Sequence, residues 1–220
     1  MRYTTNGQDA CATRILTFKF VHHYSEIFCQ MKEINEYSEK LFLVRNLLDN
    51  KQCDKYIERA ESIGFEEATI TTNWGSVMDQ SIRNNDRVIL DDEKLAKELF
   101  EITQPYIKNP CKGLYSTGLN ERFRFYKYAP GQKFDWHYDG YYQRENGERS
   151  RWTLLFYLND GYEGGATKFR STEVVGNKGD ALFFLHRQLH CGEMVKSGIK
   201  YVLRTDIMYE AEIQQLIINY

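Results

Sequence analysis

The stretch RFRFYKYAPGQKFDWHYDG, residues 122–140, decides the fold of this chain. Aromatic and basic residues alternate over its first half, which places Arg124, Tyr126 and Tyr128 on one face of a predicted strand. Pro130-Gly131 then marks a turn. A second extended segment would end at His137-Tyr138-Asp139, where side chains at i and i+2 point the same way. His137 and Asp139 could therefore reach one metal ion.

The sequence after residue 140 is also mostly typical of strands. Residues 151–158 alternate between two faces, and residues 181–185 are almost entirely apolar, as expected of a strand buried on both faces. Turn markers such as Asn159-Asp160-Gly161 and Lys178-Gly179 separate these segments. Short strands with frequent turns predict a mainly β (α+β) fold, a double-stranded β-helix or jelly roll of cupin type.

Two helices are expected before the β region. Residues 41–47 form an apolar run typical of a strand, after which Asp49 or Asn50 would cap a helix that stops at Gly64. Asp91 would cap a second helix that ends near Pro105. Both have apolar residues at helical spacing, so we expect them to pack on one sheet as supporting helices.

A ligand set for ferrous iron can be assembled from these residues. Two imidazoles and one carboxylate hold Fe(II) on one face and leave the opposite face open. His137 and Asp139 are two candidates, and either His190 or His186 could be the third. Lys200 and Arg204 share one strand face further on, and either cation could hold a carboxylate ligand.

Four blocks resemble the prolyl-4-hydroxylase-like branch of the Fe(II)/2-oxoglutarate dioxygenases. They span residues 122–140, 151–169, 179–190 and 195–209 and occur in the family's order. The resemblance implies that iron binds His137, Asp139 and His190, and it favours His190 over His186 because a lysine follows it by ten. The same spacing implies that Lys200 holds the far carboxylate of 2-oxoglutarate, with Arg204 as the alternative or assisting cation. Tyr128 and Thr153 are the other implied 2-oxoglutarate contacts.

The resemblance implies a hydroxylase that uses Fe(II), 2-oxoglutarate and O₂, with ascorbate as a further stimulant. An unactivated C–H bond would be hydroxylated while 2-oxoglutarate is converted to succinate and CO₂. The substrate would be a prolyl or other amino-acid residue, in a peptide or protein, or a small molecule. The sequence departs from the prolyl hydroxylases at Asp206, where those enzymes often carry tryptophan. A cupin-type metalloenzyme that does not use 2-oxoglutarate, or an inactive metal-binding module, are the alternatives.

Substrate contacts are expected from arginines near the iron ligands. The segment 143–151 directly follows the His-x-Asp pair and could be a lid or a solvated hairpin loop, while residues 83–87 could line the access to the site. The candidate substrate-binding residues are Arg87, Arg124, Arg144 and Arg149. Because arginine pairs well with carboxylates, an acidic or peptide-like substrate would suit them.

Composition limits the remaining possibilities. At 220 residues, with 42% hydrophobic and 15% aromatic content, the chain suits one globular domain over residues 36–220, with a jelly-roll core at about 115–210. Residues 1–35 form an extension of unclear structure. A formal charge of -2 argues against a nucleic-acid or membrane-surface partner. Five cysteines without a C-x-x-C pair and no apolar run long enough to span a membrane favour the cytoplasm.

Overall fold

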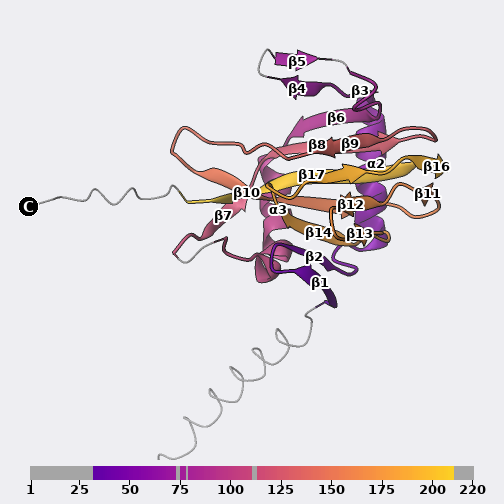
Figure 1. Cartoon of the computed structure of the whole chain (residues 1–220). Helices are drawn as coiled ribbons and strands as arrows, with labels where there is room; N and C mark the ends of the chain where they lie inside the picture. The colour runs from indigo at the N-terminus through magenta and orange to yellow at the C-terminus, as the bar shows by residue number, and fades with distance from the viewer. Residues whose placement is uncertain (1–31, 73–74, 78, 111–112, 211–220) are drawn as a thin grey trace, which may run out of the picture. The chain divides into compact units, whose positions relative to one another are not determined.

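The computed structural model describes residues 32–72, 75–77, 79–110 and 113–210 (Figure 1). The described residues from Ile34 onward belong to one compact unit. The extension expected over residues 1–35 lies almost wholly outside the described residues.

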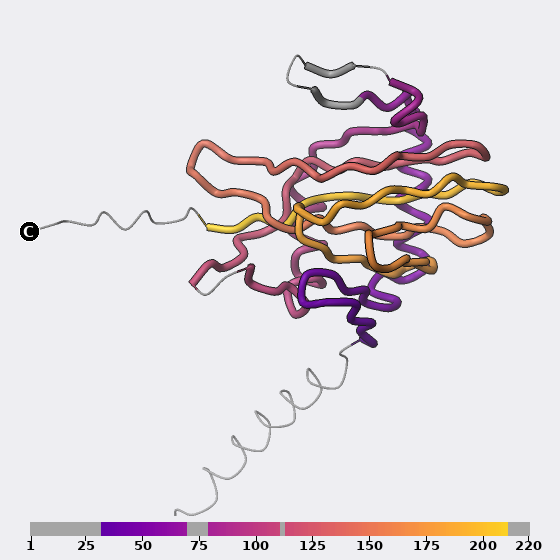
Figure 2. Tube along the Cα trace, in the orientation of Figure 1, coloured from indigo at the N-terminus to yellow at the C-terminus, as the bar shows by residue number. Residues whose placement is uncertain are grey.

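The larger of two principal antiparallel sheets has nine strands among the described residues. Their order is β1 (Ile34–Ser38), β2 (Leu41–Val44), β14 (Ala181–Leu185), β10 (Arg149–Tyr157), β17 (Lys200–Tyr209), β8 (Arg122–Tyr128), β6 (Asp86–Asp91) and β3 (Glu66–Glu67), and β7 (Ser116–Leu119) also pairs with β17. Strands far apart in sequence lie side by side, such as the indigo β2 and the orange β14 (Figure 2).

The smaller sheet lies over the larger one. Its order is β13 (Glu173–Val174), β12 (Thr167–Phe169), β15 (His190–Gly192) and β9 (Phe134–His137). Two short antiparallel pairs complete the described strands, β11 (Glu163–Gly164) with β16 (Val195–Ser197) and β4 (Ile70–Thr72) with β5 (Gly75–Val77). From β8 to β17, the chain alternates between the two principal sheets, which confirms the predicted double-stranded β-helix.

Strand β10 shows how the alternating sequence builds two cores. Leu154 and Phe156 belong to the buried cluster that the helices cover, whereas Leu155 and Tyr157 belong to the cluster between the sheets. Its neighbour β14 is buried at residues 181–184, as its apolar sequence predicted. Because successive side chains point to opposite faces, one strand can serve both cores.

The helices cover the outer face of the larger sheet and lie behind the strands in Figure 1. Helix α2 (Asn50–Ile63) begins with a capping box between Asp49 and Gln52 and ends at Gly64, which has a φ of 96°. Helix α3 (Glu93–Thr103) is followed by the short 3-10 helix η2 (Gln104–Tyr106). Asp92 caps α3 rather than the expected Asp91, which still belongs to strand β6.

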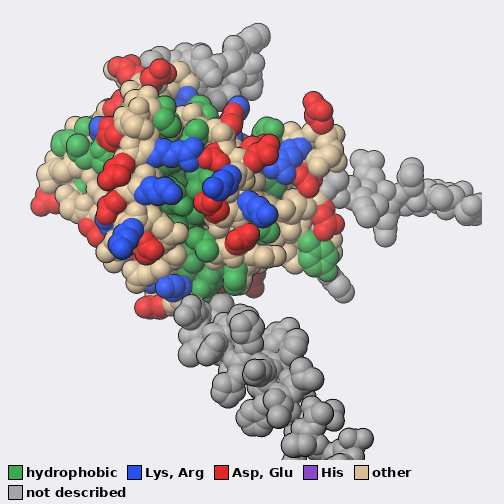
Figure 3. All heavy atoms as spheres, turned by 180° about the vertical axis from the view of Figure 1, so that it is seen from behind, with side chains coloured by type: hydrophobic (Ala, Val, Ile, Leu, Met, Phe, Trp, Pro, Cys, Tyr) green, Lys and Arg blue, Asp and Glu red, His purple; other side chains and the backbone are tan. Residues whose placement is uncertain are grey.

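The outer surface carries interspersed positive and negative side chains (Figure 3). Ion pairs tie helix α2 to its surroundings: Arg59 contacts Asp92 at 2.7 Å, and Glu61 contacts Lys127 of β8 at 2.8 Å. No helix in the part of the chain that the structure describes is long and apolar enough to cross a membrane.

Candidate metal centre and cosubstrate cavity

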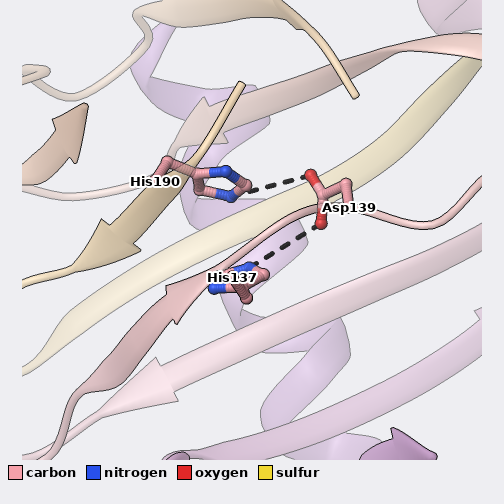
Figure 4. A group of neighbouring side chains, drawn as sticks. All are labelled: His137, Asp139 and His190. Atoms are coloured by element: carbon pink, nitrogen blue, oxygen red, sulfur yellow. Dashed lines mark ion pairs between the residues drawn. The ribbon is translucent and has the colours of Figure 1, made fainter. Parts of the chain in front are cut away.

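His137, Asp139 and His190 converge on the inner side of the smaller sheet (Figure 4). His137 ends β9, His190 begins β15, and the two residues are direct partners in the antiparallel pairing. Asp139 lies just past the end of β9. The nitrogen and oxygen atoms that could bind a metal all lie within 4.8 Å of one another. The structure therefore brings together the three residues that the sequence singled out, and His186 lies elsewhere.

Backbone carbonyls orient both imidazoles. Nδ1 of His137 lies 2.7 Å from the carbonyl oxygen of Asp135, and Nδ1 of His190 lies 2.9 Å from that of Gln188. A carbonyl oxygen only accepts hydrogen bonds, so each Nδ1 carries the proton and each Nε2 keeps its lone pair. The Nε2 atoms lie 3.8 and 3.7 Å from the two oxygens of Asp139. Both rings thus turn a free lone pair toward the carboxylate.

Asp139 is held as an anion. Its Oδ2 accepts a hydrogen bond from the Thr153 hydroxyl at 2.6 Å, and its Oδ1 lies 3.1 Å from Nη2 of Arg204. Burial raises the pKa of Asp139, but the charge of Arg204 and the Thr153 hydrogen bond contribute to a larger opposing effect, and the pKa lies well below its usual range. The carboxylate is therefore ionised near neutral pH.

The two histidines are held neutral. Burial lowers the pKa of His137 to about 4, and burial also lowers the pKa of His190. A neutral imidazole and an ionised carboxylate are the forms that bind a metal. The site needs no proton loss at neutral pH before a divalent ion can bind.

A cavity opens beside the three residues. It has a volume of about 450 Å³, counted to where it meets solvent. Its lining comprises Tyr126, Tyr128, Phe134, His137, Asp139, Leu155, Thr167, His190, Gly192, Lys200, Val202 and Arg204. The cavity therefore combines the candidate metal ligands with two cations.

Lys200 is the cation of this cavity that has no acidic partner among the described residues. Its side chain is buried, its Nζ donates to the carbonyl oxygen of Gly165 at 2.6 Å, and burial lowers its pKa to about 8. The rings of Tyr128, Tyr157 and Tyr162 lie 5.4 to 5.9 Å from Nζ. Because burying an unpaired charge is costly, an anionic group that reaches Lys200 would be strongly favoured.

Arg204 is already paired on both sides. Its Nη2 contacts Asp139 at 3.1 Å and Asp206 at 3.0 Å. Asp206 lies two residues further along the same strand, β17. The contact with Asp139 was not expected, since nothing in the local sequence shows which strands face each other. This pairing leaves Lys200 as the better candidate for a cosubstrate carboxylate.

The other two predicted 2-oxoglutarate contacts occupy different positions. Tyr128 lines the cavity and is the direct partner of Lys200 in the pairing of β8 with β17. Thr153 is buried and bonds Asp139 instead of lining the cavity. Tyr128 is placed to contact a cavity ligand, and Thr153 is placed to orient a candidate metal ligand.

The four arginines predicted to bind substrate do not line this cavity. Arg87 donates to Thr69 at 3.2 Å, and Arg124 lies 3.6 Å from Asp206. Arg144 pairs with Glu148 at 2.6 Å and with Glu121. The guanidinium carbon of Arg149 lies 3.4 Å from the centre of the Tyr141 ring, in a neighbouring pocket that also touches Asp139. The structure thus brings one of the four, Arg149, next to the site.

The segment 143–151 forms a hairpin. Gln143 and Arg149 form a β-bridge, and the amide of Arg144 donates to the carbonyl oxygen of Glu148 at 2.9 Å. A hairpin is compatible with both possibilities left open by the sequence, so the lid over the site stays a prediction. In the 83–87 segment, Arg83 is buried, with its guanidinium 4.7 Å from the Tyr126 ring and 4.3 Å from the Phe134 ring.

Comparison with known proteins agrees with this fold and site. Residues 123–205 match the family model of the 2OG-Fe(II) oxygenase superfamily, and the double-stranded β-helix and the His-Asp-His group agree with this match. Fe(II) and 2-oxoglutarate are the metal and cosubstrate of the superfamily. The chain is similar to prolyl 4-hydroxylases in sequence and fold, which agrees with the resemblance seen in the sequence.

Two plant proteins and two solved structures illustrate the likeness. The chain is 25% identical over 150 residues to "Probable prolyl 4-hydroxylase 3" of Arabidopsis thaliana, covering 66% of this chain and 50% of the relative. It is 24% identical over 140 residues to "Prolyl 4-hydroxylase 5" of the same plant, covering 62% and 47%. The chain spans about half the length of these curated relatives.

Among solved structures, the viral collagen prolyl hydroxylase of Paramecium bursaria Chlorella virus-1, in its 2OG complex, has a TM-score of 0.53 and 21% identity, covering 78% of this chain and 97% of that one. A Pseudomonas putida prolyl-4-hydroxylase has a TM-score of 0.58 and 15% identity, covering 76% and 92%. At these identities the likeness shows the shared fold.

Proposed function

We propose that this protein is an Fe(II)- and 2-oxoglutarate-dependent hydroxylase that acts on an unactivated C–H bond, with a prolyl residue of a peptide or protein as its substrate. One observation carries the proposal. A buried lysine without an acidic partner among the described residues lines the same cavity as two neutral imidazoles and an ionised carboxylate. A dicarboxylate that binds a metal with one end and the lysine with the other fits this arrangement.

The donor set fits ferrous iron. His137, Asp139 and His190 would hold the ion through two Nε2 atoms and one carboxylate oxygen, a combination that leaves other positions open for small ligands. When bound, iron and 2-oxoglutarate supply the oxidising chemistry, in which O₂ is consumed, 2-oxoglutarate becomes succinate and CO₂, and the substrate gains a hydroxyl group.

The chain's own residues supply orientation. Lys200 would hold the far carboxylate of 2-oxoglutarate, with the Tyr128 hydroxyl beside it, so that the cosubstrate has one orientation in the cavity. Arg204 and Thr153 each hold one oxygen of Asp139 and prevent its carboxylate from rotating. The aromatic residues of the cavity reduce access of water to the reacting groups.

The prolyl substrate is supported by the relatives. The curated matches include "Prolyl 4-hydroxylase 5", and one neighbour of related fold is described as a prolyl hydroxylase in complex with a hypoxia-inducible-factor peptide fragment. The other substrates expected from the sequence, a different amino-acid residue or a small molecule, become outcomes of the test.

Succinate release tests the proposal. The protein would be incubated with Fe(II), 2-oxoglutarate, ascorbate and proline-containing peptides, and compared with reactions that lack peptide, iron or 2-oxoglutarate. We expect succinate and hydroxylated peptide in equal amounts. Metal-dependent product without succinate would indicate a cupin-type enzyme that does not use 2-oxoglutarate, and metal binding with no turnover of any peptide or small molecule would indicate an inactive module.

Two alanine variants sharpen the ligand assignment. His190→Ala should lose both turnover and the binding of one divalent ion per chain. His186→Ala is a matched control, because His186 is also buried but lies 3.5 Å from Asp206 rather than at the candidate centre. Full activity in His190→Ala, with loss in a folded His186→Ala protein, would show that the ligand assignment is wrong.

A further inference from the structure

A second pocket adjoins the candidate metal centre. It has a volume of about 780 Å³, counted to where it meets solvent, and Asp139 lines both it and the cavity that contains Lys200. Gly140, Tyr141 and Leu185 contribute to its walls. Because the two spaces share a candidate metal ligand, a molecule bound in the second pocket would lie next to the reacting centre.

The second pocket is positively charged. Arg149, Arg151, His186 and Arg187 line it, and Asp139 is the acidic residue among its lining residues. The charge of Asp139 is already matched by Arg204 at 3.1 Å. The positive charge that remains available to an anionic ligand is that of Arg149 and Arg187.

Two of these arginines have no carboxylate partner among the described residues. Arg149 rests on the Tyr141 ring, 3.4 Å from its centre, and its Nε is buried without a hydrogen bond. Arg187 is exposed and makes no ion pair with the described residues. By contrast, Arg144 of the same hairpin contacts two glutamates. The aromatic ring holds the Arg149 guanidinium in place without neutralising its charge.

We infer that the substrate carries a carboxylate, adjacent to the hydroxylated residue, that binds Arg149 and Arg187 in the second pocket. This inference rests on the proposed function and adds a substrate class to it, an acidic peptide. A guanidinium binds a carboxylate through two parallel hydrogen bonds, which fixes orientation as well as adding affinity. Leu185 and Tyr141 offer an apolar surface for the neighbouring part of the peptide.

A carboxylate can come from an acidic side chain or from the C-terminus of a peptide, and matched peptides separate these sources. Three blocked, fluorescein-labelled peptides would differ only in the residues that flank a central proline, which would be glutamate, glutamine or lysine. A fourth peptide would end in proline with a free carboxylate. Binding would be measured by fluorescence anisotropy with the protein loaded with Mn(II) and 2-oxoglutarate, where no turnover occurs.

We expect the glutamate peptide to bind at least about tenfold more tightly than the glutamine peptide, and the lysine peptide to bind most weakly. Arg149→Gln and Arg187→Gln should each reduce the glutamate preference. Arg122→Gln is the charge-matched control, since Arg122 pairs with Asp91 at 2.9 Å on the surface. Tight binding of only the free-carboxylate peptide would also support the inference and would identify the C-terminus as the source.

Equal affinities for the glutamate and glutamine peptides, with no gain from a free C-terminus, would overturn the inference. So would a glutamate preference that persists in both folded arginine variants. Substrate-free succinate formation is measured in parallel for the unmodified protein and for Arg122→Gln, which should form succinate at the same rate. Absence of succinate from the unmodified protein would contradict the proposed function instead, so the two failures are distinguishable.

Discussion

The affinity of this protein for 2-oxoglutarate should fall as pH rises from 7 to 9, because Lys200 loses its proton in that range. Burial lowers the pKa of Lys200 to about 8. The protonated ammonium attracts a carboxylate, whereas the neutral amine does not. About nine-tenths of the side chain is protonated at pH 7 and about one-tenth at pH 9, so affinity should fall about tenfold. The carboxylates of 2-oxoglutarate stay ionised throughout.

Two other groups at the site, His137 and Tyr128, do not titrate in this range, whereas burial of Tyr126 is outweighed by Arg204, Arg83 and Arg124, which lower its pKa from the usual value of 10. The pKa of His137 is lowered to about 4, and burial raises the pKa of Tyr128 above its usual value of 10. The assay is calorimetric titration of 2-oxoglutarate into Mn(II)-loaded protein at pH 7, 8 and 9. A pH dependence that is lost when Lys200 is replaced by arginine would report on Lys200 rather than on Tyr126.

Two variants test the assignment. Lys200→Arg keeps a charge that does not titrate below about pH 12, so its affinity should not depend on pH. Lys200→Ala removes charge-assisted hydrogen bonds worth roughly 1.5–3 kcal/mol each and should bind 2-oxoglutarate about ten- to a hundredfold more weakly at pH 7, or weaker still. A pH-independent affinity in the unmodified protein would refute the reasoning. A larger loss in folded Arg204→Ala than in Lys200→Ala would transfer the anchor role to Arg204.

Three further perturbations follow from the same contacts. Lys200→Met should stabilise the unliganded protein at pH 7 by up to about 3 kcal/mol in urea unfolding, because burial lowers the pKa of Lys200 from 10.5 to about 8. The cost of burying the charged lysine, and with it the difference in stability, disappears as pH rises from about 8 to 10.5. Equal stability of the two proteins at pH 7 would contradict this prediction. Thr153→Val removes the 2.6 Å hydrogen bond to Asp139 and should weaken Mn(II) binding about 10- to 100-fold in a metal titration, whereas unchanged binding would show that this bond does not orient the carboxylate. Asp206→Asn leaves Arg204 with one acidic partner and should destabilise the protein by about 3 kcal/mol. The melting temperature should fall by roughly 6–12 °C. A fall of less than about 2 °C would show that this ion pair contributes little to stability.

The local parts of the fold and site could be predicted from the sequence. Alternation along residues 151–158 indicated a strand that serves two faces, and the observed burial of β10 follows that pattern. The helix that begins after Asp49 and stops at Gly64 was predicted because each capping residue lies directly beside the helix end that it caps. The proximity of His137 and Asp139 depends on a separation of only two residues in a nearly extended segment. Each of these features depends on residues close together in the chain, where backbone geometry follows directly from the order of residue types.

Contacts between distant segments were decided by the tertiary structure alone. The pairing of β15 with β9 sets His190 opposite His137, whereas His186, only four residues earlier, contacts Asp206 of the larger sheet. The sequence offered Lys200 and Arg204 as similar cations on one strand face. The fold pairs Arg204 with Asp139 and Asp206, and it leaves Lys200 beside a single carbonyl oxygen.

For the arginines near the site, the sequence likewise indicated the residue types, and the tertiary structure decided which of them are paired. The sequence indicated that arginines occur in the segment 143–151, but Arg144 is neutralised by two glutamates, one of them in a distant segment, while Arg149 lies on an aromatic ring in a pocket that also touches Asp139. The sequence by itself determined the double-stranded β-helix, the supporting helices and the types of residue available for the site. Only the tertiary structure decided which charges are paired and which remain free for a ligand, because that depends on which sheets and strands bring distant side chains within a few ångströms of one another.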